Sequence, residues 1–446
     1  MPVKVEISNN IKIQGLPKEE VDWLTEQLTL TNPHFAKKKA MGLSIWGVPQ
    51  YKKYYSREAP KTLVVPIGVL DYVLNHNPVV TDNRTTNSFK KKYTFNGTLY
   101  PYQKKFVAAA MSHGQGIIKA KTGSGKTICF INLFIQRKQT TLIVMHLKDL
   151  INQTKASLLK FTDIPKEDIG RIIGKKIELK PITFVTLQTL NAIVKKRPKD
   201  LEIINNYFGQ VFADETHVIA AETFYNAMNS LKCKYRYGFS ATPRRDDGLT
   251  KLIYFSCGNL IHSVPDKYAD AKLIKPNYKQ IETNFYFPLF NTNEYQDMIT
   301  YLSSDEERNE LILEVFNTCP EEYCMFLCER VDQVEWFHSK ISGSVMITAD
   351  TPTKEREEIR SGLVSKKYKV GIATTAIFST GIDIPHLQAL FICAPFKSYN
   401  KVKQVGGRVM RQAAGKSYAV IYDFVDQLIP LLAKHADKRA KLLTTL

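Results

Sequence analysis

The chain has 446 residues, which is enough for two to four domains of about 100–200 residues each. Hydrophobic residues make up 44% of the chain and charged residues 24%, and this composition excludes wholesale disorder. The formal net charge is +19, which points to a polyanionic partner: nucleic acid in the simplest case, with an anionic membrane as the alternative.

The composition also indicates a compartment. No apolar run approaches the roughly 18 residues that a membrane-spanning helix needs, and the first residues lack the apolar core of a signal peptide. The seven cysteines are scattered, which fits a reducing compartment better than a disulfide framework. We therefore expect a cytoplasmic protein that is neither secreted nor bound to a membrane.

Residues 1–90 mix charged and aromatic side chains, and residues 81–92 form a polar stretch that we interpret as a linker. Beyond it, short β-branched runs alternate with helical patterns, which is typical of buried parallel sheets. The expected strands form two series: residues 116–120, 141–146, 182–186, 210–214 and 235–240, then residues 324–328, 344–348, 368–374, 389–394 and 418–422.

These patterns predict an α/β protein with three parts. A small α+β domain spans residues 1–90, one parallel-sheet lobe spans residues 91–280, and a second spans residues 281–446. The two lobes join in a less regular, proline-containing segment at about residues 244–300.

A phosphate-loop pattern follows the first expected strand at residues 120–127, with alanine at its first position in place of glycine. Small residues let backbone N–H groups close around phosphate oxygens, Lys126 can reach the terminal phosphates, and the Thr127 hydroxyl can bind Mg²⁺. The alternative is an ordinary Gly-rich turn, which the preceding strand and the following apolar helix disfavour. The expected nucleotide-binding residues here are Lys121, Thr122, Gly123, Ser124, Gly125, Lys126 and Thr127.

A second motif, which is acidic, lies at the end of the strand at residues 210–214: Asp214-Glu215-Thr216-His217. At the tip of a buried parallel strand, Asp214 can hold the Mg²⁺ while Glu215 acts as base on the attacking water. Alone, this tetrapeptide would be a solvated acidic turn. Together with the phosphate loop it indicates an enzyme that hydrolyses a nucleoside triphosphate.

The motifs and their order resemble those of superfamily 2 helicases from about residue 99 to residue 424. The resemblance implies two RecA-like lobes, and it implies that Gln103, in a Tyr-Gln element upstream of the loop, contacts adenine. Ser240-Ala-Thr242 resembles the motif that couples hydrolysis to movement, a role that we also expect for His217.

In the second lobe, residues 375–383 and 404–411 resemble helicase motifs V and VI. The resemblance implies that Arg408 and Arg411 act as arginine fingers on the γ-phosphate, and that Gly381, Asp383 and Gln404 help to bind the nucleotide. Spaced three apart, the two arginines can lie on one helix face. A solvated basic helix face is the alternative.

Three further stretches are expected to contact nucleic acid. Thr186, Gln188 and Thr189 follow a strand, as do Thr374 and Thr375, and hydroxyl and amide groups suit phosphate contacts. Helix capping is the alternative for Thr186 or Thr189. The third stretch follows the strand at residues 141–146, and a nucleic-acid contact there is the weaker expectation because the proline usual in the family is missing.

The subfamily is suggested by residues 238–248, which resemble XPB-related and UvsW-like phage branch-migration helicases. In XPB-type proteins an Arg-acidic-Asp element follows this motif and assists duplex opening, and Arg245-Asp246-Asp247 stands in that place. A charged surface turn is an equal alternative. If the protein is viral, its compartment is the host cytoplasm.

Two basic regions remain. In residues 32–55, lysines are interleaved with aromatic residues, and such a segment either binds nucleic acid or fills a small core under a solvated lysine face. For Lys434, Lys438, Arg439 and Lys441 we expect a solvated helix face. Cys319, Cys324 and Cys328 lack a fourth suitably spaced ligand for zinc, so we expect core thiols and no structural metal.

The leading hypothesis is a monomeric, ATP- and Mg²⁺-dependent DNA helicase that unwinds or branch-migrates forked, branched or single-stranded DNA in recombination, repair or replication. One alternative is a double-stranded DNA translocase that does not separate strands, and another is an RNA helicase. A nucleic-acid-binding scaffold with a regulatory nucleotide site is a fourth possibility, against which the presence of Glu215, Arg408 and Arg411 argues.

Overall fold

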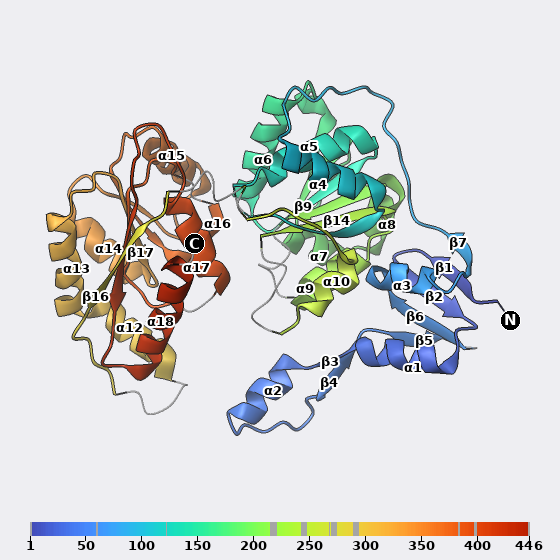
Figure 1. Cartoon of the computed structure of the whole chain (residues 1–446), viewed down its shortest axis with the longest axis horizontal. Coiled ribbons are helices and arrows are strands. Elements are labelled where there is room, and N and C mark those ends of the chain that lie inside the picture. Colours follow the sequence, from blue (N-terminus) through green and yellow to red (C-terminus); the bar gives the residue numbers. More distant parts are fainter. Residues whose placement is uncertain are drawn as a thin grey trace. The chain divides into compact units, whose positions relative to one another are not determined.

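The computed structural model describes residues 2–58, 61–121, 123–214, 221–241, 248–266, 268, 274–288, 294–381, 384–396 and 399–444. It divides into two compact units, Met1–Tyr268 and Ala269–Leu446 (Figure 1).

The N-terminal part of unit 1 is built on a mixed five-stranded sheet in the order β5-β6-β2-β1-β7. Only the β1–β7 pair is parallel. Alternate residues of β1 and β2 are buried, so one face of the sheet packs against helices α1 and α3. The elements are β1 (Lys4–Ile7), β2 (Asn10–Gln14), α1 (Lys18–Gln27), β5 (Ser56–Glu58), β6 (Thr62–Pro66), α3 (Leu70–Leu74) and β7 (Val79–Asp82).

The large sheet of unit 1 has eight strands in the order β11-β10-β12-β9-β13-β14-β8-β15, parallel except for the β10–β11 hairpin. Its central strands are short, apolar and almost completely buried, as expected for a sheet covered on both faces. The strands are β8 (Gln115–Lys119), β9 (Thr141–Met145), β10 (Ile169–Ile173), β11 (Lys176–Glu178), β12 (Ile182–Thr186), β13 (Gln210–Asp214), β14 (Tyr235–Ser240) and β15 (Leu260–Ser263).

Helices cover both faces of this sheet. One apolar core lies under three of them: α4 (Pro101–Ser112), α5 (Lys126–Arg137) and α6 (Lys148–Phe161). The other lies under four: α7 (Leu187–Lys196), α8 (Pro198–Tyr207), α9 (Ala221–Asn229) and α10 (Lys251–Cys257).

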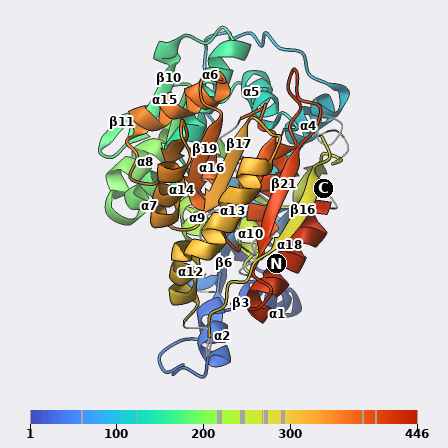
Figure 2. The same cartoon turned by 90° about the vertical axis from the view of Figure 1, so that its left-hand side faces the viewer.

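Unit 2 is organised in the same way around a parallel six-stranded sheet in the order β16-β21-β20-β17-β19-β18 (Figure 2). Two apolar cores occupy its two faces. The strands are β16 (Asn277–Glu282), β17 (Cys324–Cys328), β18 (Val345–Ile347), β19 (Val370–Thr374), β20 (Ala389–Ile392) and β21 (Val420–Val425). The helices are α12 (Tyr295–Ser304), α13 (Glu306–Thr318), α14 (Val331–Lys340), α15 (Thr353–Val364), α16 (Thr375–Gly381), α17 (Tyr399–Val409) and α18 (Pro430–Thr444).

The predicted fold class, two parallel-sheet lobes after a small α+β domain, is confirmed, and every strand of both predicted series is present. Four strands of the two large sheets were not predicted: β10 and β11 in unit 1, and the edge strands β15 and β16, which lie in the segment expected to be irregular. Strands β15 and β16 are largely exposed, so they lack the buried apolar run of an inner strand. The expected lobe boundary at residue 280 falls inside β16, which pairs with β21, and the units divide between Tyr268 and Ala269.

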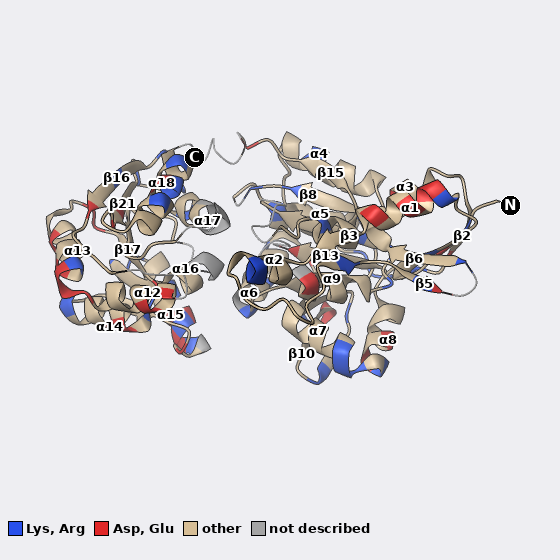
Figure 3. Ribbon diagram, turned by 90° about the horizontal axis from the view of Figure 1, so that it is seen from below, with Lys and Arg blue, Asp and Glu red and all other residues tan. Residues whose placement is uncertain are grey.

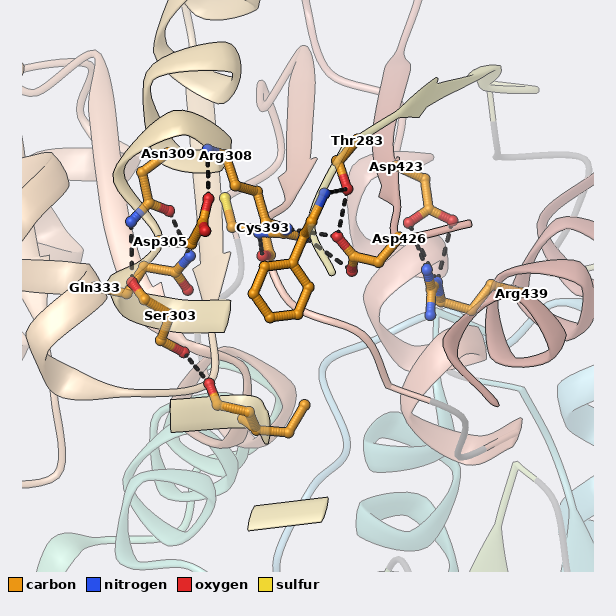
Figure 4. Close-up of polar contacts among 12 residues, drawn as sticks. Thr283, Ser303, Asp305, Arg308, Asn309, Gln333, Cys393, Asp423, Asp426 and Arg439 are labelled. Atoms are coloured by element: carbon orange, nitrogen blue, oxygen red, sulfur yellow. Dashed lines mark hydrogen bonds and ion pairs between the residues drawn. The ribbon is translucent and has the colours of Figure 1, made fainter. Parts of the chain in front are cut away.

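Two buried ion pairs fix β21 in unit 2 (Figure 4). The Arg308 guanidinium on α13 lies 2.6 Å from Asp426, just after the strand, and the Arg439 guanidinium on α18 lies 2.8 Å from Asp423 within it. The expectation of a solvated face for Arg439 is therefore wrong, because its side chain is 1% exposed and satisfies a carboxylate inside the sheet. Lys434, Lys438 and Lys441 are exposed as expected.

Within the described residues, no helix combines the length and the apolar character needed to cross a bilayer.

Candidate functional site

Four predicted motifs lie at the ends of four strands in a row of five in the unit 1 sheet. In the order β12-β9-β13-β14-β8, the carboxyl ends of parallel strands meet at one edge, where ligands bind in open α/β sheets. The phosphate loop follows β8, Ser240 ends β14, and Asp214 ends β13. Thr186 ends β12 at the other side of the row. The edge thus has a phosphate side and, separated from it by β9, a side with the predicted nucleic-acid contacts.

The phosphate loop makes a tight turn into α5. Gly123 and Gly125 have φ angles of +88° and +80°, a region that favours glycine. The Ser124 hydroxyl donates to the Lys121 carbonyl at 2.7 Å, which closes the turn. Helix α5 then begins at Lys126, so its first backbone N–H groups face the loop. This is the geometry of an anion-binding helix N-terminus joined to a glycine-rich loop.

Two side chains from α4 hold the loop in place. The Gln103 amide and the Tyr102 hydroxyl each donate to the Ser124 carbonyl at 3.1 Å. The Gln103 carbonyl oxygen accepts from the Tyr100 backbone N–H at 2.9 Å, and the side chain is buried. Gln103 therefore braces the phosphate loop, and its expected contact with adenine stays a prediction.

Lys126 and Asp214 converge at this edge. The Lys126 ammonium lies 4.0 Å from the Asp214 carboxylate, and both side chains are largely buried, with 9% and 15% exposed. A second ion pair joins Lys121 to Asp266 at 3.3 Å. Asp214 and Thr127 offer carboxylate and hydroxyl oxygens, which are the donors that Mg²⁺ prefers, so the residues fit the predicted metal.

Several predicted residues lie outside the described part of the chain. These are Thr122, Glu215, His217, Thr242, Arg245 and Asp383, together with the side chain of Gln404. Ser240 is described and fully buried, and its carbonyl accepts from the N–H of Ala120, the first residue of the phosphate loop, at 2.9 Å. Its coupling role stays a prediction.

The predicted nucleic-acid contacts in unit 1 are partly helix caps. Thr186 is the N-cap of α7: its hydroxyl oxygen accepts from the Thr189 N–H at 3.2 Å and lies 2.8 Å from the Thr189 hydroxyl. The capping interpretation is thus confirmed for Thr186. Gln188 is exposed on the first turn of the same helix and does not cap it.

In unit 2, Thr374 and Thr375 differ. Thr374 ends β19 and is partly exposed, whereas Thr375 is fully buried and donates to the Cys328 carbonyl at 3.0 Å. The Thr375 hydroxyl therefore stabilises the junction of β19 and α16. Because it is buried there, its predicted role as a nucleic-acid contact is corrected to a structural one. Gly381 is the last residue of α16.

The two predicted arginine fingers do not share a helix face. Helix α17 ends at Val409, two residues before Arg411, because the Lys416 ammonium donates to the carbonyls of Val409 and Arg411 and takes the place of further helical N–H groups. The expectation of one helix face is therefore wrong. Arg408 lies on α17 with its guanidinium 5.4 Å from the centre of the Phe378 ring of α16, and both arginines are partly exposed.

The cysteines lie where core thiols are expected. Cys324 and Cys328 are buried in β17, and Cys319 is partly exposed. Burial raises the pKa of the Cys129 thiol, in the helix after the phosphate loop, to about 12. Among the described residues, no group of three or more potential ligands is placed to hold a metal ion.

Sequence reasoning missed the contact between the N-terminal part and the helix that follows the Asp214 motif. Lys52 on strand β4 (Tyr51–Lys53) forms an ion pair with Glu222 in the first turn of α9, and the Tyr54 hydroxyl also contacts Glu222, at 3.3 Å. The two partners are separated by 170 residues, so no local pattern could have indicated the pair.

The comparisons with known proteins agree with this arrangement. The family model described as "Type III restriction enzyme, res subunit" matches residues 96–245, and the model described as "Helicase conserved C-terminal domain" matches residues 307–413. The protein 161L of Invertebrate iridescent virus 6 is 29% identical over 348 residues, covering 73% of this chain and 75% of its own.

Two further relatives extend the comparison. The DNA 3'-5' translocase XPB2 of Sulfurisphaera tokodaii is 26% identical over 356 residues, covering 70% of this chain and 79% of its own. The crystal structure of T4 UvsW aligns with 99% of this chain and 97% of its own at 15% identity and a TM-score of 0.43. The two family models fall in order on the two sheets, and the chain is a superfamily 2 helicase, an ATP-hydrolysing enzyme homologous to the XPB-type DNA helicases.

Proposed function

We propose that the chain is a DNA motor that couples ATP hydrolysis to 3′-to-5′ translocation and to unwinding or branch migration of forked or junction DNA. The proposal rests on one observation above all: Lys126 meets Asp214 at 4.0 Å beside a tight phosphate loop, on the same sheet edge as the exposed Gln188. A motor needs an ATP site and a nucleic-acid contact on one rigid sheet, so that ATP hydrolysis at one site can drive movement of the nucleic acid at the other. The choice of DNA and of polarity draws on the similarity to XPB2, which is named a DNA 3'-5' translocase.

In the proposed mechanism, backbone N–H groups of Gly123, Ser124 and Gly125 surround the phosphates of ATP, and Lys126 neutralises the terminal phosphates. Thr127 and Asp214 would hold Mg²⁺, which would supply charge neutralisation. Phosphoryl transfer requires positioned charge more than covalent chemistry. The remaining proposed roles are water activation by Glu215, charge stabilisation by Arg408 and Arg411, nucleotide contacts from Gln103, Gly381, Asp383 and Gln404, and coupling through His217, Ser240 and Thr242.

The test is the ATPase rate of the full chain with no nucleic acid, single-stranded, duplex, forked and four-way DNA, and matched RNA. We expect the strongest stimulation by forked or four-way DNA. Stimulation by RNA alone would refute the DNA assignment, and no stimulation by any polymer would favour a regulatory nucleotide site on a scaffold.

The role of the phosphate loop is tested by Lys126→Ala, which should lower kcat by about 100-fold or more because the lost charge acts on the transition state. Lys176→Ala is the matched control, since Lys176 lies on β11 of the same sheet with its side chain 81% exposed. A Lys126→Ala variant within about tenfold of the unaltered chain would overturn the assignment.

A translocase that moves on duplex DNA without separating strands is the second candidate, because XPB2 is named a translocase. Displacement of a labelled strand from a forked duplex, measured beside displacement of a triplex-forming strand from a duplex, separates the two. Triplex displacement without fork unwinding would favour this second candidate.

A further inference from the structure

A short arm projects from the N-terminal part of unit 1. It comprises residues 29–53: strand β3 (Thr29–Thr31), helix α2 (Pro33–Ala40), a loop, and strand β4, which pairs with β3 in antiparallel register. In Figures 1 and 2, α2 and its loop lie beyond the five-stranded sheet of this part of the chain.

The arm folds without an apolar core of its own. Helix α2 buries none of its residues. Its N-cap Asn32 is buried instead, accepting from the His34 N–H at 3.1 Å and donating to the Pro49 carbonyl at 2.9 Å, so polar contacts tie the two sides of the arm together. The large apolar side chains of the loop are consequently exposed: Met41 37%, Leu43 49%, Ile45 39% and Trp46 91%. Several exposed apolar residues within six positions mark a binding surface rather than a folding one.

The charge of the arm indicates what kind of partner it binds. No Asp or Glu occurs from Gln27 to Arg57, a run of 31 residues in which the average composition of the chain would place about three. The same run contains Lys37, Lys38 and Lys39 on α2 and two lysines on β4. Figure 3 shows the basic residues of α2 in blue. A polyanion fits this surface. An anionic membrane fits it less well, because α2 has exposed or half-buried residues all round and lacks the single apolar face of an interfacial helix.

A groove of about 600 Å³ lies at the base of the arm, between β4, the residues after it, and α9. It is lined by apolar side chains of β6 together with lysines, tyrosines and amides, among them Lys53, Tyr55, Asn226 and Asn229. Among the described residues that line it, Glu222 is the one acidic residue. The lysines, tyrosines and amides suit contacts with a sugar-phosphate chain without selecting its sequence. The groove leads from the arm to the helix that follows the Asp214 motif.

We propose that this arm binds an unpaired DNA strand, such as one exposed at a fork or junction. The α2 lysines contact phosphates, Trp46 at the tip stacks on an exposed base, and the groove at the base of the arm receives the adjoining backbone. Aromatic stacking and lysine contacts together are the usual way in which proteins hold single strands without sequence preference. The inference rests on the proposed function and goes beyond it by naming the strand-contact surface.

The first experiment is fluorescence anisotropy of labelled single-stranded, forked and blunt duplex DNA with the full chain and its Trp46→Ala variant. We expect Trp46→Ala to weaken binding to single-stranded and forked DNA by about 5- to 100-fold, the loss of one base stack, and to change blunt-duplex binding less than twofold. Trp46→Tyr should restore most of the affinity, because a smaller aromatic ring still stacks. Trp46 is 91% exposed, so its replacement leaves the packing intact, which circular dichroism checks.

The second experiment replaces Lys37, Lys38 and Lys39 by alanine and compares a matched triple variant. The slope of log affinity against log salt for single-stranded DNA should fall by up to about 2, since each released phosphate contact contributes about 0.7. The control variant replaces Lys195, Lys196 and Lys199, which are exposed at the C-terminal end of α7 and the start of α8. This replacement removes the same charge from the same unit. Its slope should stay within about 0.5 of that of the unaltered chain.

The outcomes separate the two proposals. Equal losses from the arm and control triples, or an unchanged affinity of Trp46→Ala, would overturn the arm assignment while DNA-stimulated ATPase of the unaltered chain keeps the motor. An unaltered chain without any DNA stimulation would remove the motor itself. Binding of the arm to phosphatidylglycerol vesicles, with none to DNA, would assign the surface to a membrane and refute the inference.

Discussion

Replacing Arg308 by methionine tests whether a buried ion pair holds the unit 2 sheet together. The Arg308 guanidinium is fully buried, contacts both carboxylate oxygens of Asp426 at 2.6 and 3.3 Å, and donates to the Cys393 carbonyl at 2.6 Å. In the variant, Asp426 would keep the Thr283 hydroxyl, at 2.7 Å, as its described hydrogen-bond donor. Methionine nearly fills the volume of the arginine stem, so the change removes charge and hydrogen bonds more than packing.

The expected cost follows from this geometry. Removing one partner of a buried pair leaves the other charge without compensation and typically costs 3–5 kcal/mol. A unit of this size is stable by about 5–15 kcal/mol, so Arg308→Met should bring unit 2 close to unfolding. Replacing both partners, as in Arg308→Met with Asp426→Leu, removes the uncompensated charge and should recover most of the loss.

Urea unfolding measures this effect if it reports on unit 2 alone. Trp336 on α14 lies in unit 2, whereas Trp23 and Trp46 lie in unit 1. A background in which Trp23 and Trp46 are phenylalanine therefore makes Trp336 fluorescence a local probe. The exposed ion pair of Lys340 with Glu310, at 3.3 Å and with both side chains 43% exposed, supplies the control.

Lys340→Met should cost at most about 1 kcal/mol, because a surface pair is screened by water and salt. If Arg308→Met lowers the free energy of unfolding by no more than Lys340→Met does, the buried ion pair does not hold the unit 2 sheet together. A double variant as unstable as Arg308→Met alone would show that the uncompensated Asp426 charge is not the cause of the loss.

Three further predictions follow from particular contacts. Gly125→Ala should lower kcat/KM for ATP at least about tenfold with the fold retained, because the new Cβ would meet the Gln103 amide at 2.3 Å in a left-handed turn; steady-state kinetics with circular dichroism checks this. Gly68→Ala should destabilise unit 1 by about 1–3 kcal/mol in urea unfolding, since its Cβ would lie 2.0 Å from the Tyr254 carbonyl oxygen. Maleimide at neutral pH should label Cys319 before any other thiol, because a hydrogen bond from Cys324 lowers its pKa and it alone is not buried; mass spectrometry of the native chain would show another cysteine reacting first if this is wrong.

The sequence was sufficient wherever local pattern decides the structure. Short runs of β-branched residues between helical patterns located every inner strand of both large sheets except β10, because a strand covered on both faces is apolar throughout. Arg171 interrupts the apolar run of β10. The phosphate loop could equally be predicted from the sequence, since glycine at positions 123 and 125 is what a left-handed turn into a helix requires.

What the sequence could not show depends on partners distant along the chain. The burial of Arg439 depends on Asp423 in a strand that precedes its helix, and the end of α17 before Arg411 depends on a lysine five residues further on. The arm was visible only as an alternation of lysines and aromatic residues, because a segment without a core has no hydrophobic periodicity to detect.

The junction between the N-terminal part and the ATP-binding sheet decides what the arm can do. Leu252 and Phe255 of α10 belong to the same apolar core as the N-terminal sheet, and the Gln115 amide at the start of β8 donates to the Ile67 carbonyl at 3.0 Å. Gly68 allows the two backbones to approach, because any side chain there would meet the carbonyl of Tyr254. A domain that shares its core with its neighbour cannot swing independently without exposing that core. A strand held by the arm would therefore be fixed in the frame of the phosphate loop and Asp214, so that a DNA contact at the tip and ATP at the sheet edge act on one rigid body.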